Sequence, residues 1–129
     1  MDSKFPQMED LEVWKECRKL RIEFRNLAKR LPPDERFRLV DQLTRACRSI
    51  TNNISEGYGR FHYQENIQYL RQSRGSIYEC IDDLYVCIDE EYIDKKLFTD
   101  LYNQSHLCIK LINGYIRYLS NKKNGNNTK

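Results

Sequence analysis

The sequence predicts an all-α protein that forms an antiparallel, up-down-up-down four-helix bundle. Apolar residues recur at helical spacing along nearly the whole chain, and no Val/Ile/Thr-rich alternation is long enough for a strand. The segments between the helical stretches are short, which favours antiparallel neighbours. With 129 residues, of which 40% are hydrophobic, the chain is long enough for one domain with its own core. We expect a flexible segment at 1–8, the bundle at 9–120 and a disordered, apolar-poor tail at 121–129.

The first helix is expected over residues 9–30, where Pro32 and Pro33 follow and end it. A proline at the first helical position, with Asp34 and Glu35 near the positive end of the helix dipole, predicts that the second helix starts there. Its apolar stripe comprises Leu39, Leu43, Ala46, Cys47, Ile50 and Ile54. It should end at the Gly57-Tyr58-Gly59 exit, where a glycine can take the left-handed cap conformation.

The third helix is expected over residues 63–89, and the acidic residues 89–91 at its carboxyl end predict fraying there. Asp94 is the expected N-cap of the fourth helix. The predicted inner face of that helix comprises Leu97, Leu101, Cys108, Ile112, Tyr115 and Leu119.

The second helix carries an ordered polar face almost opposite its apolar stripe. This face comprises Arg45, Ser49, Asn53, Glu56 and Arg60. On the third helix, Ser76 and Glu79 are expected to point away from the core, and Gly75 beside them costs a helix about 1 kcal/mol relative to alanine. A close backbone approach at Gly75 would explain that cost. The set is interpreted as an assembly or register surface, with a solvated face or a ligand site as the alternatives.

Arg74 falls inside the apolar stripe of the third helix, where an unpaired guanidinium would be costly. Either its stem lies along the edge of the core with the head in water, or it pairs with a carboxylate such as Glu56.

Positive charge is concentrated near the amino terminus. Residues 14–48 hold eleven Lys and Arg against five Asp and Glu, whereas residues 49–119 hold seven against ten. The predicted nucleic-acid-binding residues are Lys15, Arg18, Arg25 and Lys29, opposite the core stripe of the first helix, and Arg36 and Arg38, which open the second. Such a surface can neutralise phosphates with release of counterions. The alternative is a solvated basic face balanced by the acidic third helix.

Enzymatic, metal and cofactor sites are not indicated. The glycines at 57 and 59 lack the strand and lysine of a phosphate loop, the carboxylates lack the Glu-x-x-His spacing of bundle metal sites, and neither histidine can be placed beside a cysteine. The five cysteines form an odd set without a CxxC pair, which suits small core residues in a reducing compartment. No apolar run is long enough to span a membrane, and the amino terminus does not resemble a secretory signal, so we expect a cytoplasmic protein.

Short motifs between Leu11 and Leu119 resemble a known family. They are Leu31-Pro32, Glu35-Arg36, Gln42-Leu43, Arg45-Ala46, Ser49-Ile50, Asn53-Ile54, Glu56-Gly57, Gly59-Arg60, Leu70-Arg71, Arg74-Gly75-Ser76 and Glu79. The chain resembles the small bacterial four-helix-bundle proteins encoded in intervening sequences of large-subunit ribosomal RNA genes. That family is similar to the accessory variability determinant of diversity-generating retroelements. The sequence departs from the family pattern at Thr51, where proline is favoured, at Ser55, and at Gln72-Ser73.

The resemblance implies a ring-shaped homo-oligomer, a pentamer, with RNA or DNA and, in one branch, a reverse transcriptase as partners. Two functions from different classes are therefore expected. The first is a non-catalytic, nucleic-acid-associated adaptor that presents a basic helix face. The alternative is a structural or protein-interaction bundle without direct nucleic-acid binding.

Overall fold

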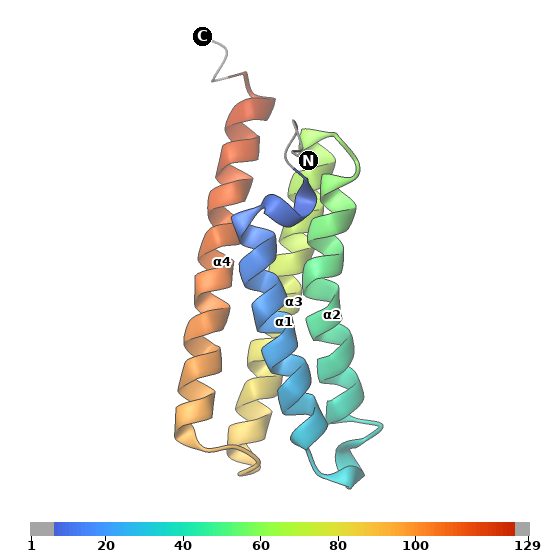
Figure 1. Cartoon of the computed structure of the whole chain (residues 1–129), viewed down its shortest axis with the longest axis vertical. Helices are drawn as coiled ribbons and strands as arrows, with labels where there is room; N and C mark the ends of the chain where they lie inside the picture. Colours follow the sequence, from blue (N-terminus) through green and yellow to red (C-terminus); the bar gives the residue numbers. More distant parts are fainter. Residues whose placement is uncertain (1–6, 126–129) are drawn as a thin grey trace, which may run out of the picture.

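Four long helices account for most of the protein. The computed structural model describes residues 7–125, and within them all regular structure is helical. The elements are the 3-10 turns η1 (Met8–Asp10) and η2 (Pro33–Glu35) and the helices α1 (Glu12–Arg30), α2 (Leu39–Tyr58), α3 (Tyr63–Asp89) and α4 (Lys95–Lys123) (Figure 1). The predicted all-α class with four helices is confirmed. None of the helices in the described range is long and apolar enough to cross a membrane.

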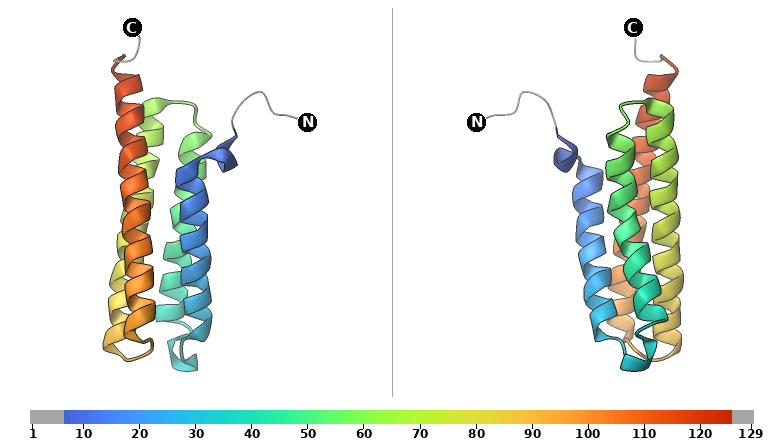
Figure 2. Two further views of the ribbon diagram at one scale, coloured as in Figure 1. Left: turned by 60° about the vertical axis from the view of Figure 1, so that its left-hand side comes forward. Right: turned by 90° about the vertical axis from the view of Figure 1, so that its right-hand side faces the viewer.

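Each helix packs against two others: α1 contacts α2 and α4, and α3 contacts the same two helices. The α1–α2 and α3–α4 connections lie at one end of the long axis, while the α2–α3 connection, the start of α1 and the end of α4 lie at the other end (Figures 1 and 2). In the right view of Figure 2, α1 and α2 stand side by side along most of their length.

The core runs along the axis between the helices. Its largest fully buried side chains come from all four helices: Leu20 and Phe24 of α1, Leu43, Ile50 and Ile54 of α2, Leu70, Ile77 and Leu84 of α3, and Leu101 and Ile112 of α4. All five cysteines are buried and free, as their positions on apolar stripes predicted. Each fully buried aliphatic or aromatic side chain stabilises the fold by roughly 1.5–3 kcal/mol.

Two helices begin later than the sequence indicated. α1 starts at Glu12, because residues 8–10 form the separate turn η1. α2 starts at Leu39, because Arg38 has a non-helical backbone, with φ −124° and ψ −98°. The Glu35 carboxylate accepts a hydrogen bond of 3.4 Å from the Leu39 amide, so the acidic residue expected in the first turn caps α2 from outside it. The prediction that Arg36 and Arg38 open the helix is therefore wrong, and they lie in the connection.

The exit from α2 also differs from the prediction. Gly59 keeps a right-handed backbone, with φ −71°, and the left-handed residue is Phe61, with φ 53°. The expected left-handed glycine cap is thus wrong. Asp94 does cap α4, since its carboxylate accepts a 2.9 Å hydrogen bond from the Leu97 amide.

The ends of α3 and α4 bear on the fraying and the disordered tail that the sequence predicted. α3 ends at Asp89, as predicted, and the expected fraying there stays a prediction. α4 continues to Lys123, so residues 121–123 of the expected tail are helical. Residues 126–129 of that tail and residues 1–6 of the expected flexible segment lie outside the described residues.

Candidate nucleic-acid interface

A groove with a basic lining runs between α1 and α2, and we name it the α1–α2 groove. Its wider part has a volume of about 740 Å³ and is lined by Trp14, Arg21, Arg45, Arg48, Ser49, Thr51, Asn52 and Ser55. A narrower part of about 250 Å³ is lined by Arg21, Ile22, Arg25, Asn26, Lys29, Cys47 and Arg48. Arg21 and Arg48 line both parts, which joins them. The lining residues follow helical spacing. Trp14, Arg21, Arg25 and Lys29 lie along one edge of α1, and Arg45, Arg48, Asn52 and Ser55 lie along one edge of α2.

Arg21 is fixed in position at the middle of this groove. Its Nη1 donates a hydrogen bond of 2.8 Å to Oγ1 of Thr51 on α2, and Thr51 is buried. Proline is the residue that the resemblance favours at position 51, and proline has no side-chain acceptor. The departure from the family pattern thus supplies the partner that orients this guanidinium.

The positive charge of the groove is largely uncompensated. Among the described residues, Arg21, Arg25, Lys29 and Arg48 form no ion pair. Arg45 does pair with Asp41, at 3.2 Å, but both side chains are exposed, and such pairs contribute little. The groove therefore offers guanidinium and ammonium groups to an anionic ligand.

The six residues predicted to bind nucleic acid lie in three places. Arg25 and Lys29 line the groove. Lys15 and Arg18 lie beside it, in a shallow depression of about 720 Å³ that also contains Glu9, Glu12 and Glu16. Arg36 and Arg38 lie in the connection before α2.

Arg21 and Arg48 were missed by the sequence reasoning, although they are central to the groove. The available signal was spacing: Arg21 lies seven residues after Trp14 and four before Arg25, on one helix edge. The edge of α2 that faces Arg21 depends on how the helices pack, which the spacing does not give.

Part of the polar face of α2 makes contacts inside the chain, with α3. Ser76 donates to Ser49 Oγ at 2.9 Å, and Asn53 donates to the same oxygen at 2.9 Å. Ser76 is buried, so the prediction that it points away from the core is wrong. One turn earlier on α3, Ser73 donates to the backbone carbonyl of Ile50 at 2.7 Å. These bonds hold α2 and α3 in one relative position.

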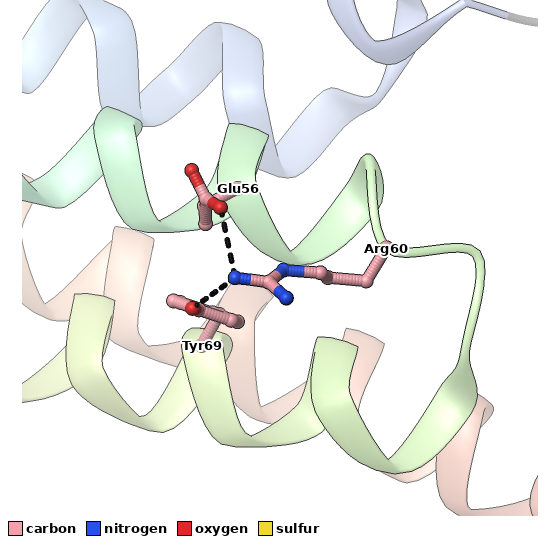
Figure 3. A network of polar contacts seen from close by, with 3 residues as sticks. All are labelled: Glu56, Arg60 and Tyr69. Carbon is pink, nitrogen blue, oxygen red and sulfur yellow. Dashed lines mark hydrogen bonds and ion pairs between the residues drawn. The ribbon is translucent and has the colours of Figure 1, made fainter.

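The same face ends in a small network at the α2–α3 connection (Figure 3). Arg60 Nη2 lies 3.1 Å from a carboxylate oxygen of Glu56 and donates a 2.8 Å hydrogen bond to the Tyr69 hydroxyl. The guanidinium carbon also lies 5.2 Å from the centre of the Tyr69 ring. Arg60 thus ties the last turns of α2 to α3.

Arg74 is half-buried. Its Nη1 donates a 2.6 Å hydrogen bond to the side-chain carbonyl of Asn113 on α4, so the alternative in which it pairs with Glu56 is wrong. A stem along the edge of the core stays a prediction. Gly75 is exposed, and a Cβ built there would meet nothing within 4 Å. The predicted close approach at Gly75 is therefore wrong within the chain.

A second groove, of about 470 Å³, lies between α2 and α3 and carries acidic groups. Its lining comprises Gln42, Arg45, Ala46, Ser49, Glu79, Asp82 and Asp83. Burial, together with the nearby charges of Asp82 and Glu79, raises the pKa of the Asp83 carboxyl to about 6. This side of α2 is unsuited to an anionic ligand, in contrast to the side that faces α1.

The free thiols of the core are all buried. Burial raises the pKa of Cys47, and it raises the pKa of Cys87 to about 11, which disfavours the reactive thiolates. Within residues 7–125, no group of three or more His, Cys, Asp or Glu side chains is placed to hold a metal ion.

Comparisons with known proteins agree on one family. Residues 9–114 match the family model described as 23S rRNA-intervening sequence protein. The structure is similar to the crystal structure of a protein of unknown function from the S23 ribosomal protein family of Bacteroides thetaiotaomicron. The TM-score is 0.75 at 25% sequence identity, over 81% of this chain and 97% of that chain. A search of curated proteins finds no match.

Proposed function

The chain belongs to the 23S rRNA-intervening sequence protein family, and we propose that it is a non-catalytic adaptor that binds nucleic acid through the α1–α2 groove. The observation that carries this proposal is the row of cations in the groove. Arg21, Arg25, Lys29 and Arg48 lie along facing edges of two helices and have no ion-pair partner among the described residues. Phosphates would release counterions on binding there, which gives affinity that does not depend on sequence and falls with salt.

The proposal includes the arrangement and assembly of the bundle. The up-down-up-down order is supported by the ends of the long axis at which the connections lie (Figure 1). A ring-shaped homo-oligomer and a reverse transcriptase as a further partner are carried over from the resemblance. A location in the cytoplasm is carried over from the apolar and charge patterns of the sequence. A ring would repeat the groove around its circumference and raise the overall affinity for a long strand by avidity.

The salt dependence of RNA binding tests the proposal. Arg21, Arg25 and Arg48 are replaced together by glutamine, and a matched control replaces Lys95, Lys110 and Arg117, three exposed cations of α4, which packs against α1 and α3. Both variants lose the same charge. We expect the groove variant to bind RNA more weakly and to have a flatter salt slope, by about one for each phosphate that is no longer neutralised. The control should lose far less of either.

Equal losses in the two variants would contradict the groove as the binding site. Unchanged affinity and slope in the groove variant would instead favour the alternative, a structural or protein-interaction bundle. Circular dichroism and urea unfolding of both variants show whether the fold is retained, which matters because Arg21 also bonds to Thr51.

A further inference from the structure

The two parts of the α1–α2 groove differ in chemistry. The narrow part presents mainly charge, through Arg25 and Lys29. The wide part adds an aromatic ring and uncharged polar groups, which are Trp14, Ser49, Asn52 and Ser55. Phosphate binding alone needs only the charge. An aromatic face beside amide and hydroxyl groups is the set of contacts that an unpaired base uses.

Trp14 is placed to offer part of its ring to a ligand. It packs partly against the core and remains partly exposed, while it lines the wide part of the groove. The Arg18 guanidinium lies over the ring, 5.8 Å from its centre, and a base that stacks on that face would replace it there. The core contacts on one side hold the ring in a fixed orientation.

The cations lie where the backbone of such a strand would pass. Arg21 is two helical turns from Trp14 and is held by Thr51, so less entropy is lost in orienting it when a ligand binds. Arg48 lies across the groove without an ion-pair partner among the described residues. The volume of about 740 Å³ falls within the roughly 300–1,000 Å³ typical of ligand sites.

We propose that the wide part of the groove binds single-stranded nucleic acid, with an unpaired base stacked on Trp14, its edge hydrogen-bonded to Asn52, and the adjoining phosphates on Arg21 and Arg48. This inference rests on the proposed function and specifies its substrate class. A duplex buries its base faces within the helix, so it offers no base that can stack on Trp14. Single strands should therefore bind more tightly than duplexes of the same length.

Trp14 is the only tryptophan in the chain, so its fluorescence reports on this site alone. The full chain is titrated at one low salt concentration with a twelve-nucleotide oligouridine, a thymidine DNA of equal length and a twelve-base-pair RNA duplex. We expect both single strands to quench Trp14 emission and to bind at least about tenfold more tightly than the duplex. A preference for RNA over DNA would add a contact to the 2′-hydroxyl, and equal binding would assign the site to base and phosphate alone; both support the proposal.

Three variants identify the stacking contact through the anisotropy of a labelled oligouridine. Trp14→Ala should weaken binding between about fivefold and about a hundredfold, as expected for the loss of one stacked base. Trp14→Phe keeps an aromatic face and should retain most of the affinity, which also guards against a folding defect in the alanine variant. Phe61→Ala removes an exposed ring at the α2–α3 connection and should leave affinity unchanged.

Two results would overturn the inference in distinguishable ways. If duplex and single strand bind equally, Trp14 emission does not change and Trp14→Ala binds normally, then base stacking is wrong. In that case the salt slope lost in the Arg21, Arg25 and Arg48 variant still supports the proposed function. If none of the three oligonucleotides binds, the inference and the proposed function both fail.

Discussion

Ser76 of α3 donates a 2.9 Å hydrogen bond to the hydroxyl oxygen of Ser49 on α2. Ser49 also accepts from Asn53, one turn further along its own helix. Buried polar groups need partners, so a shift of α3 along α2 by one turn would separate Ser76 from Ser49 and leave a buried hydroxyl with a poorer set of bonds. The apolar side chains between the helices tolerate small shifts more easily. The serine pair therefore fixes the relative position of α2 and α3.

We predict that Ser49 and Ser76 are energetically coupled. Unfolding of Ser49→Ala, Ser76→Ala and the double variant in urea should give a coupling free energy of about 0.5–1.5 kcal/mol, the usual contribution of a hydrogen bond. The cycle cancels the higher helix propensity of alanine. As the control, Ser76→Ala is combined with Thr99→Ala at an exposed position of α4, and these changes should be additive within about 0.5 kcal/mol. Additivity in the serine cycle would show that the bond has no role in stability.

Two glycines of the family-like motifs should respond to alanine in opposite directions. A Cβ at Gly57 would lie 2.8 Å from the Tyr69 Cβ and 3.2 Å from the Asn66 Cα, and neither neighbour can move without shifting α3. Gly57→Ala should therefore lower the free energy of unfolding by about 1–3 kcal/mol. Gly75→Ala should raise it by up to about 1 kcal/mol, because the new methyl group meets nothing and alanine favours the helix.

The same pair of variants also tests the assembly interpretation of Gly75. If α3 meets a neighbouring subunit at this position, Gly75→Ala should keep the fold and lower the mass measured by native mass spectrometry. An unchanged mass, together with the expected gain in stability, would show that Gly75 has no part in assembly. A loss of stability in Gly75→Ala would contradict the open space around it.

The sequence was most informative where one helix decides the outcome. The stripe of α2 from Leu39 to Ile54 and the cap at Asp94 are local patterns, and both could be predicted correctly. The environment of Ser76 could not be predicted. A serine at the margin of an apolar stripe is either solvated or bonded to the next helix, and only the packing of α2 decides which. Arg21 belongs to the groove for the same reason, since its partner Thr51 lies thirty residues away.

A hydrogen bond between Tyr92 and Glu35 joins the two connections at one end of the bundle, and it should be lost at alkaline pH. The Tyr92 hydroxyl, in the α3–α4 connection, donates a 2.7 Å hydrogen bond to Glu35 in η2. This bond to a carboxylate, together with desolvation, raises the pKa of Tyr92 to about 12. Tyrosine in the unfolded chain ionises near pH 10. The stabilisation is therefore fully present below about pH 10 and is lost as the pH rises towards 12.

Tyr92→Phe should unfold at lower urea concentration than the wild type at pH 8, and its stability should fall less steeply between pH 10 and 12. Ultraviolet absorbance of phenolate in the wild type and in the variant identifies the late-ionising group. Tyr63→Phe, at an exposed position, is the control and should retain the wild-type pH profile. If Tyr92→Phe leaves the profile unchanged, the bond to Glu35 does not persist in solution.

Asp83 should destabilise the protein at neutral pH, because its buried carboxyl must ionise in the groove between α2 and α3. Burial first, and then the charges of Asp82 and Glu79, raise its pKa to about 6. An unfolded aspartate ionises near pH 3.9, so the folded state binds the proton more tightly between these values, and stability falls as the pH rises through this range. Asp83→Asn removes this charge and should be more stable than the wild type at pH 7.5, by on the order of 1–3 kcal/mol, with little gain at pH 4. Urea unfolding at the two pH values measures the difference.

Glu79→Gln should give a smaller gain at pH 7.5, since it removes only one of the neighbouring charges. A loss of stability in Asp83→Asn at both pH values would show that the carboxylate makes a required contact, and would contradict an energetic cost of its ionisation.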